Sequence, residues 1–150
     1  MRQRHAMTSI EDVSNKIREY SARFRNPDLE QICRGEIYCL KKESSDSPEL
    51  GWPDTWPQAN RRGVYAIVSD DRVLYIGKAS QQPIGHRLSS YFRYGEAREC
   101  TTVAGHNWTH DPTHVVTWAV PDSSPFEASS LEEYLIIELK PCDNTAGKRA

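Results

Sequence analysis

Two apolar runs on either side of an acidic turn constrain the fold of this chain more than any other feature. The stretch GVYAIVSDDRVLYIGKA, residues 63–79, holds two segments rich in β-branched and aromatic residues, separated by Asp70-Asp71. Such a pattern is typical of a β-hairpin, here with strands at about 63–69 and 72–78. The hairpin also carries Tyr65 and Tyr75, which its stability does not require at these positions.

The length of the turn decides whether the two tyrosines share a face. Side chains alternate between the faces of a strand, so a two-residue loop would send Tyr65 and Tyr75 to opposite faces. A three-residue loop at 69–71 would instead pair the tyrosines directly. It would also gather an apolar set on the other face, namely Val64, Ala66, Val68, Leu74 and Ile76. We therefore predict the three-residue loop, with a bulge.

An amphipathic helix precedes the hairpin. Thr8 and Glu11 have the spacing of a capping box, and Asn26-Pro27 ends the helix. Between these signals apolar residues recur at steps of three or four, at Ile10, Val13, Ile17, Tyr20 and Phe24. The stripe predicts a helix that faces the core, with a dimer contact as the alternative.

The remaining segments complete a small α/β fold. Residues 36–42 suggest a short strand, and the connector that follows is rich in proline and carries Trp52 and Trp56. Beyond the hairpin we expect a helix from Pro83 or Ile84 to about Tyr94, followed by an irregular segment at 95–113. A strand is expected at 114–120. The last helix should start at Ser124–Glu127 and end at Lys140-Pro141. The predicted architecture is a three-stranded sheet, mixed or antiparallel, flanked by helices. We divide the chain into an N-terminal extension at 1–60, a domain at 61–145 and a tail at 146–150.

Charge and composition limit the functional classes. The net charge of −2 means that any contact with nucleic acid must be local, and basic residues do concentrate in the central third. No apolar run approaches the roughly 20 residues that span a bilayer, and the N-terminus lacks the apolar segment of a secretory signal. The cysteines, Cys33, Cys39, Cys100 and Cys142, show no paired spacing, which predicts free thiols and gives a zinc site made from them little support. We expect a cytoplasmic protein without membrane contact.

Polar residues around and beyond the hairpin supply a coherent set of chemical groups. Lys78 ends the hairpin, Arg87 and Tyr91 lie one helical turn apart, and Glu132 and Asn144 follow near the C-terminus. With the hairpin tyrosines they provide one carboxylate, two cations, three phenols and an amide. A carboxylate and water can hold Mg²⁺, an arginine can clamp a phosphate, and a phenol can accept a proton from water. Metal-assisted hydrolysis of a phosphodiester needs these groups.

The same residues stand in motifs that resemble the GIY-YIG nuclease superfamily. These motifs are GVY at 63–65, YIG at 75–77, IGKA at 76–79, RLSSYFR at 87–93, and LEEYLI at 131–136 with Pro141 and Asn144. The last three are similar to the nuclease half of UvrC, the incision subunit of bacterial excision repair. The resemblance covers roughly residues 61–145 and implies an endonuclease that cuts DNA with one Mg²⁺ or Mn²⁺ ion. We do not infer excision repair from it.

The resemblance implies a role for each matched residue. Tyr65 would be the general base on the attacking water, Arg87 would contact the scissile phosphate, and Glu132 would bind the metal. The supporting positions are Tyr75, which organises water, Lys78 beside the site, Tyr91 near the phosphate, and Asn144, which steadies the site. Contacts to the DNA substrate are expected from Arg87, Lys78 and Arg93.

Two further expectations concern charge. A phenol with an ordinary pKa of about 10 is a poor base at neutral pH, so Lys78, Arg87 and the metal must favour the phenolate. Of the other acidic residues in the last helix, Glu133 is expected to face solvent and Glu127 to cap the helix.

The role of the three histidines in residues 106–114 and the choice between possible functions are left open. His106, His110 and His114 recur at four-residue steps, but Pro112 argues against a helix, so a polar loop is favoured over a zinc site or a catalytic histidine. The main alternative function is a non-catalytic nucleic-acid-binding or protein-interaction module, and a purely structural domain is the third. A homodimer or a protein partner, DNA or RNA as substrate, and the sequence specificity are all left open.

Overall fold

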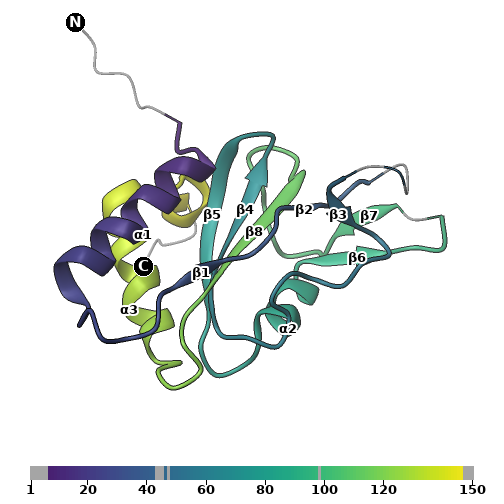
Figure 1. Cartoon of the computed structure of the whole chain (residues 1–150). Helices are drawn as coiled ribbons and strands as arrows, with labels where there is room; N and C mark the ends of the chain where they lie inside the picture. The colour runs from purple at the N-terminus through teal and green to yellow at the C-terminus, as the bar shows by residue number, and fades with distance from the viewer. Residues whose placement is uncertain (1–6, 43–45, 47, 98, 147–150) are drawn as a thin grey trace, which may run out of the picture.

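A mixed β-sheet forms the centre of the molecule, as seen in a computed structural model (Figure 1). The structure describes residues 7–42, 46, 48–97 and 99–146, so Arg98 and residues 147–150 of the predicted tail lie outside the described residues. The strands are β1 (Cys33–Arg34), β2 (Tyr38–Cys39), β3 (Leu50–Gly51), β4 (Gly63–Ser69), β5 (Arg72–Ala79), β6 (Phe92–Tyr94), β7 (Cys100–Thr102) and β8 (His114–Ala119). The helices are α1 (Ile10–Phe24), α2 (Ile84–Ser89), α3 (Glu127–Leu139) and α4 (Cys142–Ala146).

The sheet has more strands than the sequence predicted. Its order is β3-β2-β8-β4-β5, with β1 also paired to β8, while β6 and β7 form a separate hairpin. β2 and β3 are parallel, and the other described pairs are antiparallel. The mixed α/β class is confirmed, but the prediction of three strands is wrong. Residues 33–51 add β1, β2 and β3 to the sheet. A short strand was expected at 36–42, where β2 lies, but two-residue strands such as β1 and β3 carry too little periodicity to be recognised.

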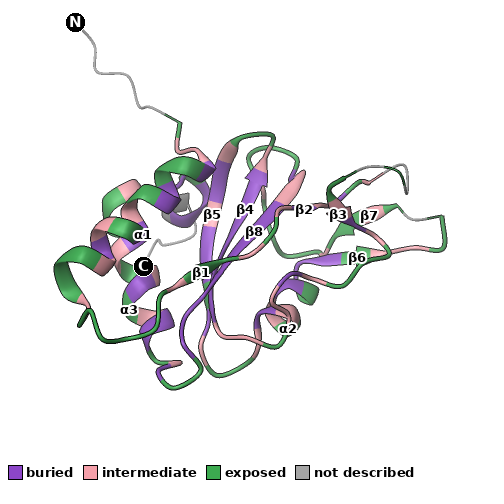
Figure 2. Ribbon diagram, viewed as in Figure 1, coloured by how far each residue is buried: buried purple, intermediate pink, exposed green. Residues whose placement is uncertain are grey.

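Helices lie on both faces of the sheet and divide the core in two. α1 and α3 cover one face, where a buried cluster is formed by residues that include Val13, Ile17, Ala66, Ile76 and Leu131. α2 and the β6–β7 hairpin lie toward the other face (Figure 1), whose cluster includes Tyr38, Tyr65, Ile67, Leu88 and Tyr91. Figure 2 shows that the central strands are buried along most of their length. No helix in the described part of the chain combines the length and apolar character needed to cross a membrane.

The tryptophans of the connector pack onto the second cluster. The ring of Trp56 lies 4.4 Å from that of Tyr38, measured between centroids, and its indole N–H donates to the Ser89 hydroxyl at 3.2 Å. Trp52 stacks on Tyr94 with centroids 5.2 Å apart. The connector is therefore held against the domain by aromatic contacts.

The turn of the β4–β5 hairpin differs from the prediction. Ser69 pairs with Arg72, so the loop has two residues and the predicted three-residue loop is wrong. Asp70 adopts a left-handed conformation with φ of 57°, which a short polar side chain tolerates better than most. Its N–H donates to the hydroxyl of Thr113 at 2.6 Å, which fixes the turn against the segment before β8.

A register shift inside the hairpin returns both tyrosines to one face. The Cα partners are Val68 with Val73, Ile67 with Tyr75, and Tyr65 with Gly77. Leu74 is therefore the extra residue of a bulge. It shifts the strand pairing by one residue, as the predicted three-residue loop would have done. The predicted direct pairing of Tyr65 with Tyr75 is wrong. The two residues nevertheless border the same cluster. Val73 takes the place predicted for Leu74 in the opposite cluster.

The cap of α1 is shifted by one residue from the predicted one. Ser9, not Thr8, is the N-cap: its hydroxyl accepts from the Asp12 N–H at 3.1 Å, and its N–H donates to the Asp12 carboxylate at 2.9 Å. Thr8 is engaged by the hairpin instead, because its carbonyl accepts from the Val73 N–H at 2.7 Å. The predicted apolar stripe is buried except for Phe24, which is 58% exposed.

α2 is shorter than predicted. It ends at Ser89, and the chain then enters β6 instead of remaining helical to Tyr94. The Ser90 hydroxyl donates to the Arg87 carbonyl at 2.6 Å, which satisfies an acceptor at the helix end. β6 pairs with β7, which lies inside the segment predicted to be irregular. Aromatic residues in β6 favour the strand over the helix.

The C-terminal helices begin after tight turns. The Ser124 carbonyl accepts from the Glu127 N–H at 3.0 Å, so α3 starts at Glu127, the last residue of the predicted start at Ser124–Glu127. Lys140 ends α3 as predicted, with a left-handed φ of 47°. The five-residue helix α4, too short to be recognised from periodicity, then carries Asn144.

Candidate active site

Three phenols meet on the face of the sheet that α2 covers. Tyr65 comes from β4, Tyr75 from β5, and Tyr91 from the turn between α2 and β6. The hydroxyl oxygens of Tyr65 and Tyr91 are 2.7 Å apart, and both residues are buried. The rings of Tyr75 and Tyr91 are 6.0 Å apart between centroids. Tyr91 therefore lies between the two tyrosines that the hairpin motif contains, and we call the three the tyrosine cluster.

A glycine makes room for this cluster. Gly77 is the cross-strand partner of Tyr65, and a Cβ at position 77 would overlap the Tyr65 phenol. The phenol ring thus lies directly over the backbone of β5. The glycine of the YIG motif is accordingly needed for close approach of the ring.

Burial dominates the acidity of the three phenols. Burial raises the pKa of Tyr65, of Tyr75 and of Tyr91, because the phenolate is poorly solvated there. The positive charge of Arg87 lowers each pKa, but by less than burial raises it. Without a bound metal, burial therefore favours the neutral form of the three phenols, and the charge of Arg87 opposes this effect only in part.

Arg87 and Lys78 line a polar hollow beside the cluster. The hollow has a volume of about 480 Å³ and is completed by Ser80, Gln81 and Gln82. Lys78 is exposed, and its ammonium donates to the hydroxyl of Ser129 at 3.3 Å. The Nε of Arg87 is buried and has no hydrogen-bond partner among the described residues. Two cations on one hollow suit an anionic ligand.

A second cavity borders Tyr75 and Tyr91. It has a volume of about 260 Å³ and is also lined by Gly105, His106, Asn107, Trp108 and Asp143. His106 lies 4.7 Å from the Tyr91 ring and 5.9 Å from the Trp108 ring, measured between centroids. The three histidines do not meet here, because His110 contacts Arg72 at 3.1 Å and His114 lies in β8.

Asp143 is a functional candidate that sequence reasoning missed. Its Oδ2 accepts from the Thr109 N–H at 3.2 Å, while its Oδ1 is buried without a partner in the described structure. The indole N–H of Trp108 is buried in the same way. The position directly before Asn144 was the only sequence signal for Asp143, and no motif of the resemblance includes it.

These unpartnered atoms have a common location. Within the described residues, the buried side-chain polar atoms without a hydrogen bond belong to Arg87, Trp108 and Asp143. Each of these residues lines one of the two cavities beside the tyrosine cluster. Such an atom costs about 1–3 kcal/mol when nothing satisfies it. Their concentration at one place favours a site that receives a polar ligand.

Asn144 ties α4 to the edge strand. Its side-chain oxygen accepts from the Ile76 N–H at 2.8 Å, and its side-chain nitrogen donates to the Ile76 carbonyl at 2.9 Å. The amide thus pairs with β5 as a neighbouring strand would. Asn144 is 3% exposed and acts on the backbone between Tyr75 and Gly77, which is the geometry of a positioning residue.

Three glutamates of α3 have distinct surroundings. Glu132 is partly buried, and its negative charge contributes to the raised pKa of Tyr75, behind burial and Tyr91. Glu133 is exposed, as predicted. Glu127 does not cap α3 as predicted, because no described side chain forms a cap hydrogen bond at the start of this helix. Its carboxylate instead accepts from the Ser124 hydroxyl at 2.7 Å and forms an ion pair with Arg25 at 2.7 Å.

The donors beside Tyr75 fit a hard divalent cation. Glu132 offers a carboxylate, Tyr75 a phenol, and the unpartnered oxygen of Asp143 lines the same cavity as Tyr75. Mg²⁺ and Mn²⁺ prefer oxygen ligands, and Mg²⁺ keeps several waters, so one carboxylate is enough to anchor it when a phosphate also binds. Glu132 is the residue that would hold the ion.

Arg93 is not brought to this site. It is exposed on β6 and lines neither of the two cavities. The remaining predicted site residues, Tyr65, Tyr75, Lys78, Arg87, Tyr91, Glu132 and Asn144, lie in or next to the tyrosine cluster and its cavities or hold its backbone.

Comparisons with protein-family models, curated proteins and solved structures found nothing that matches this chain. Function is therefore inferred from the side chains of the site and from the motif resemblance.

Proposed function

We propose that this chain is a GIY-YIG-type endonuclease that hydrolyses DNA phosphodiester bonds with one Mg²⁺ or Mn²⁺ ion. The observation that carries the proposal is the convergence of the tyrosine cluster, two cations and one carboxylate around buried polar atoms that lack partners. A phosphodiester would satisfy the buried donor of Arg87, and Lys78 lines the same hollow.

The tyrosine cluster supplies the base of the proposed reaction. Tyr65 is fully buried, and its hydroxyl contacts that of Tyr91, which lines a cavity. With Tyr65 as the phenolate, Tyr91 would pass its hydroxyl proton to Tyr65 and accept a proton from water in the cavity. Arg87 favours the phenolate of both residues, because its charge lowers their pKa values against the larger effect of burial.

The metal would complete the charge balance. When bound at Glu132, a divalent ion adds positive charge next to the phenols and neutralises charge on the phosphate. Glu132 would hold the ion, and Tyr75 would orient water beside it. Asn144 would keep the backbone of β5, and hence Tyr75, in place through both of its hydrogen bonds to Ile76.

A second candidate function is a nucleic-acid-binding module without catalysis. The observations that favour it are the complete burial of Tyr65 and the raised pKa values of all three phenols, which disfavour a base at neutral pH. Both candidates use the same cationic hollow, so they differ in chemistry and not in the surface that meets the ligand.

A cleavage assay separates the two candidates. The purified chain is incubated with supercoiled, linear and branched DNA in Mg²⁺, in Mn²⁺ or in EDTA, and retention of each DNA is measured in parallel. We expect cutting in either metal and none in EDTA. Retention of DNA without cutting in any metal would instead support the binding module, and the absence of both would contradict both candidates.

A further inference from the structure

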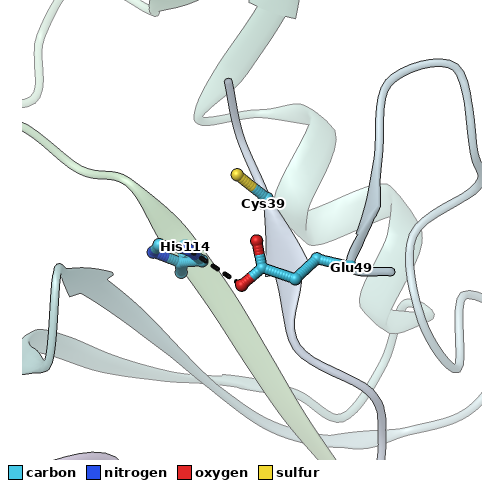
Figure 3. Close-up of side chains that lie close together, drawn as sticks. All are labelled: Cys39, Glu49 and His114. Atoms are coloured by element: carbon cyan, nitrogen blue, oxygen red, sulfur yellow. Dashed lines mark ion pairs between the residues drawn. The ribbon is translucent and has the colours of Figure 1, made fainter. Parts of the chain in front are cut away.

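Three metal-ligating side chains of different types lie together outside the tyrosine cluster. Cys39, Glu49 and His114 each offer one ligand atom, and these atoms lie within 4.8 Å of one another. Figure 3 shows the three side chains close together, with a dashed line between the carboxylate of Glu49 and the ring of His114; the Oε2 of Glu49 is 3.7 Å from the Nε2 of His114. Among the described residues, no other group of three histidine, cysteine or acidic side chains is as close.

The strands of the sheet set the positions of all three residues. Cys39 of β2 and His114 of β8 are cross-strand partners in an antiparallel pair. Glu49 directly precedes β3, which runs parallel to β2 with Leu50 opposite Tyr38. Backbone pairing, and not a flexible loop alone, therefore brings the thiol, the imidazole and the carboxylate together.

The imidazole is oriented for a ligand on the side of Glu49. The Nδ1 of His114 is 2.8 Å from the Thr113 hydroxyl, which itself donates to the Val68 carbonyl at 3.3 Å. The hydroxyl then accepts from the Nδ1–H of His114, and this tautomer leaves the lone pair of Nε2 free. A hydrogen bond to the far ring nitrogen is the usual support of a metal-binding histidine.

We propose that Cys39, Glu49 and His114 bind one Zn²⁺ ion. A thiolate, an imidazole and a carboxylate together suit zinc, whereas Mg²⁺ and Ca²⁺ prefer oxygen ligands alone. The thiol of Cys39 is free and half-buried, and the Glu49 side chain is 48% exposed, so an ion can reach the site. With three protein ligands, the fourth position is open to water.

The ion would join the N-terminal extension to the centre of the sheet. β2 and β3 have two residues each and come from residues 33–51, while β8 is one of the long central strands. Zinc at the three ligands would connect all three strands where backbone hydrogen bonds are few. This role is independent of the proposed nuclease activity, because none of the three residues belongs to the tyrosine cluster or its cavities.

Cobalt titration tests the proposal directly. Full-length protein without a tag is stripped of metal and titrated with Co²⁺, whose thiolate complexes show a charge-transfer absorption in the near ultraviolet. Zn²⁺ is then added to displace the cobalt. We expect one Co²⁺ per chain, the charge-transfer band, and loss of the band when zinc is added.

Matched variants identify the ligands. Cys39→Ser should abolish the charge-transfer band, and His114→Gln and Glu49→Gln should weaken cobalt binding at least about tenfold, the lower end of the effect of disturbing a metal site. Cys100→Ser and His110→Gln, which change the same residue types outside the group, should bind as the wild type does. Circular dichroism checks that each variant folds. If Cys39→Ser or His114→Gln fails to fold, cobalt binding by Glu49→Gln, which changes the most exposed of the three side chains, tests the site.

Two results would overturn the zinc site. One is the absence of the thiolate band in the wild type at saturating Co²⁺. The other is cobalt affinity that Cys39→Ser and Glu49→Gln leave unchanged, which would place the metal elsewhere on the chain.

Discussion

At the scale of single residues, close packing holds the tyrosine cluster in position. Gly77 lets the Tyr65 phenol lie against β5, and the Tyr65 hydroxyl contacts that of Tyr91. A methyl group at position 77 and the loss of one hydroxyl at position 65 therefore disturb the cluster in different ways. The methyl group changes how the core packs, whereas the loss of the hydroxyl removes a group that can exchange a proton.

Gly77→Ala should destabilise the fold. Its Cβ would overlap the Tyr65 phenol, and an overpacked core site of this kind typically loses about 1–3 kcal/mol. Urea unfolding measures the free energy of unfolding. The same substitution in a Tyr65→Leu background, where the phenol is absent, should cost less. An equal cost in both backgrounds would contradict the proposed contact.

Tyr65→Phe should remove a general base without changing the shape of the core. We expect cleavage to slow by about 10²–10⁴-fold, the usual contribution of a positioned base. Because burial raises the pKa of Tyr65, the wild-type rate should keep rising with pH toward about pH 10. A pH–rate profile checks this, with Tyr20→Phe in the other cluster as the control. If Tyr65→Phe keeps the pH–rate profile of the wild type, Tyr65 is not the general base.

At the scale of elements, two polar contacts join helices to the rest of the fold. Arg25, just after α1, forms a two-point ion pair with Glu127 at the start of α3, at 2.7 and 2.9 Å. Asn144 of α4 forms a two-point hydrogen bond with Ile76 of β5. Each contact links segments far apart in the sequence, and each involves groups that are largely buried.

Glu127→Gln should destabilise the protein most at neutral pH. The hydrogen bond from Arg25 lowers the pKa of Glu127 below its ordinary 4.5, so the ionised pair stabilises the fold above that value. This stabilisation is lost as the pH falls through the lowered pKa. Breaking a buried pair costs about 3–5 kcal/mol. We therefore expect Glu127→Gln to have a lower free energy of unfolding than the wild type at pH 7, and this difference to become smaller toward pH 3.

Urea unfolding at both pH values measures the Glu127 effect. Glu133→Gln, on the exposed side of the same helix, should change the free energy of unfolding little at either pH. A gap between wild type and Glu127→Gln that stays constant with pH would mean that ionisation of Glu127 does not stabilise the fold.

Asn144→Ala should expose the edge of β5. The N–H and carbonyl of Ile76 would lose their side-chain partners, at a cost of about 1–3 kcal/mol for each buried group left unsatisfied. Amide hydrogen exchange at Ile76 should become faster. Asn107→Ala, in an exposed loop position, serves as the control. Unchanged protection at Ile76 would show that Asn144 does not hold the strand.

At the scale of the whole molecule, the sequence predicted the parts of the fold that have long patterns. The hairpin strands, the strand at 114–120 and the end of α3 at Lys140 are present because β-branched runs and helix stops are local signals. Short elements were missed, since β1, β3 and α4 are too brief to show a period. The turn length was wrong because a bulge at Leu74 can shift faces as a longer loop does.

The candidate site was predicted less evenly. Residues in ordered motifs, such as Tyr65 and Arg87, lie at the tyrosine cluster. Asp143 and Trp108 were missed as site residues because their roles depend on how α4 and a loop fold over Tyr75. The proximity of Cys39, Glu49 and His114 depends on the pairing of three strands, which spacing along the chain does not reveal.

Metal-dependent DNA cleavage by a matched pair of variants, Glu132→Gln and Glu133→Gln, tests the central claim most directly. The two glutamates are adjacent on α3, but Glu132 is partly buried beside Tyr75 and Glu133 is exposed. Thermal unfolding confirms that both variants fold. The account predicts that Glu132→Gln loses cleavage in Mg²⁺ while Glu133→Gln cuts as the wild type does. Equal cleavage by the two variants would contradict the metal-binding role of Glu132 and the nuclease site built around it.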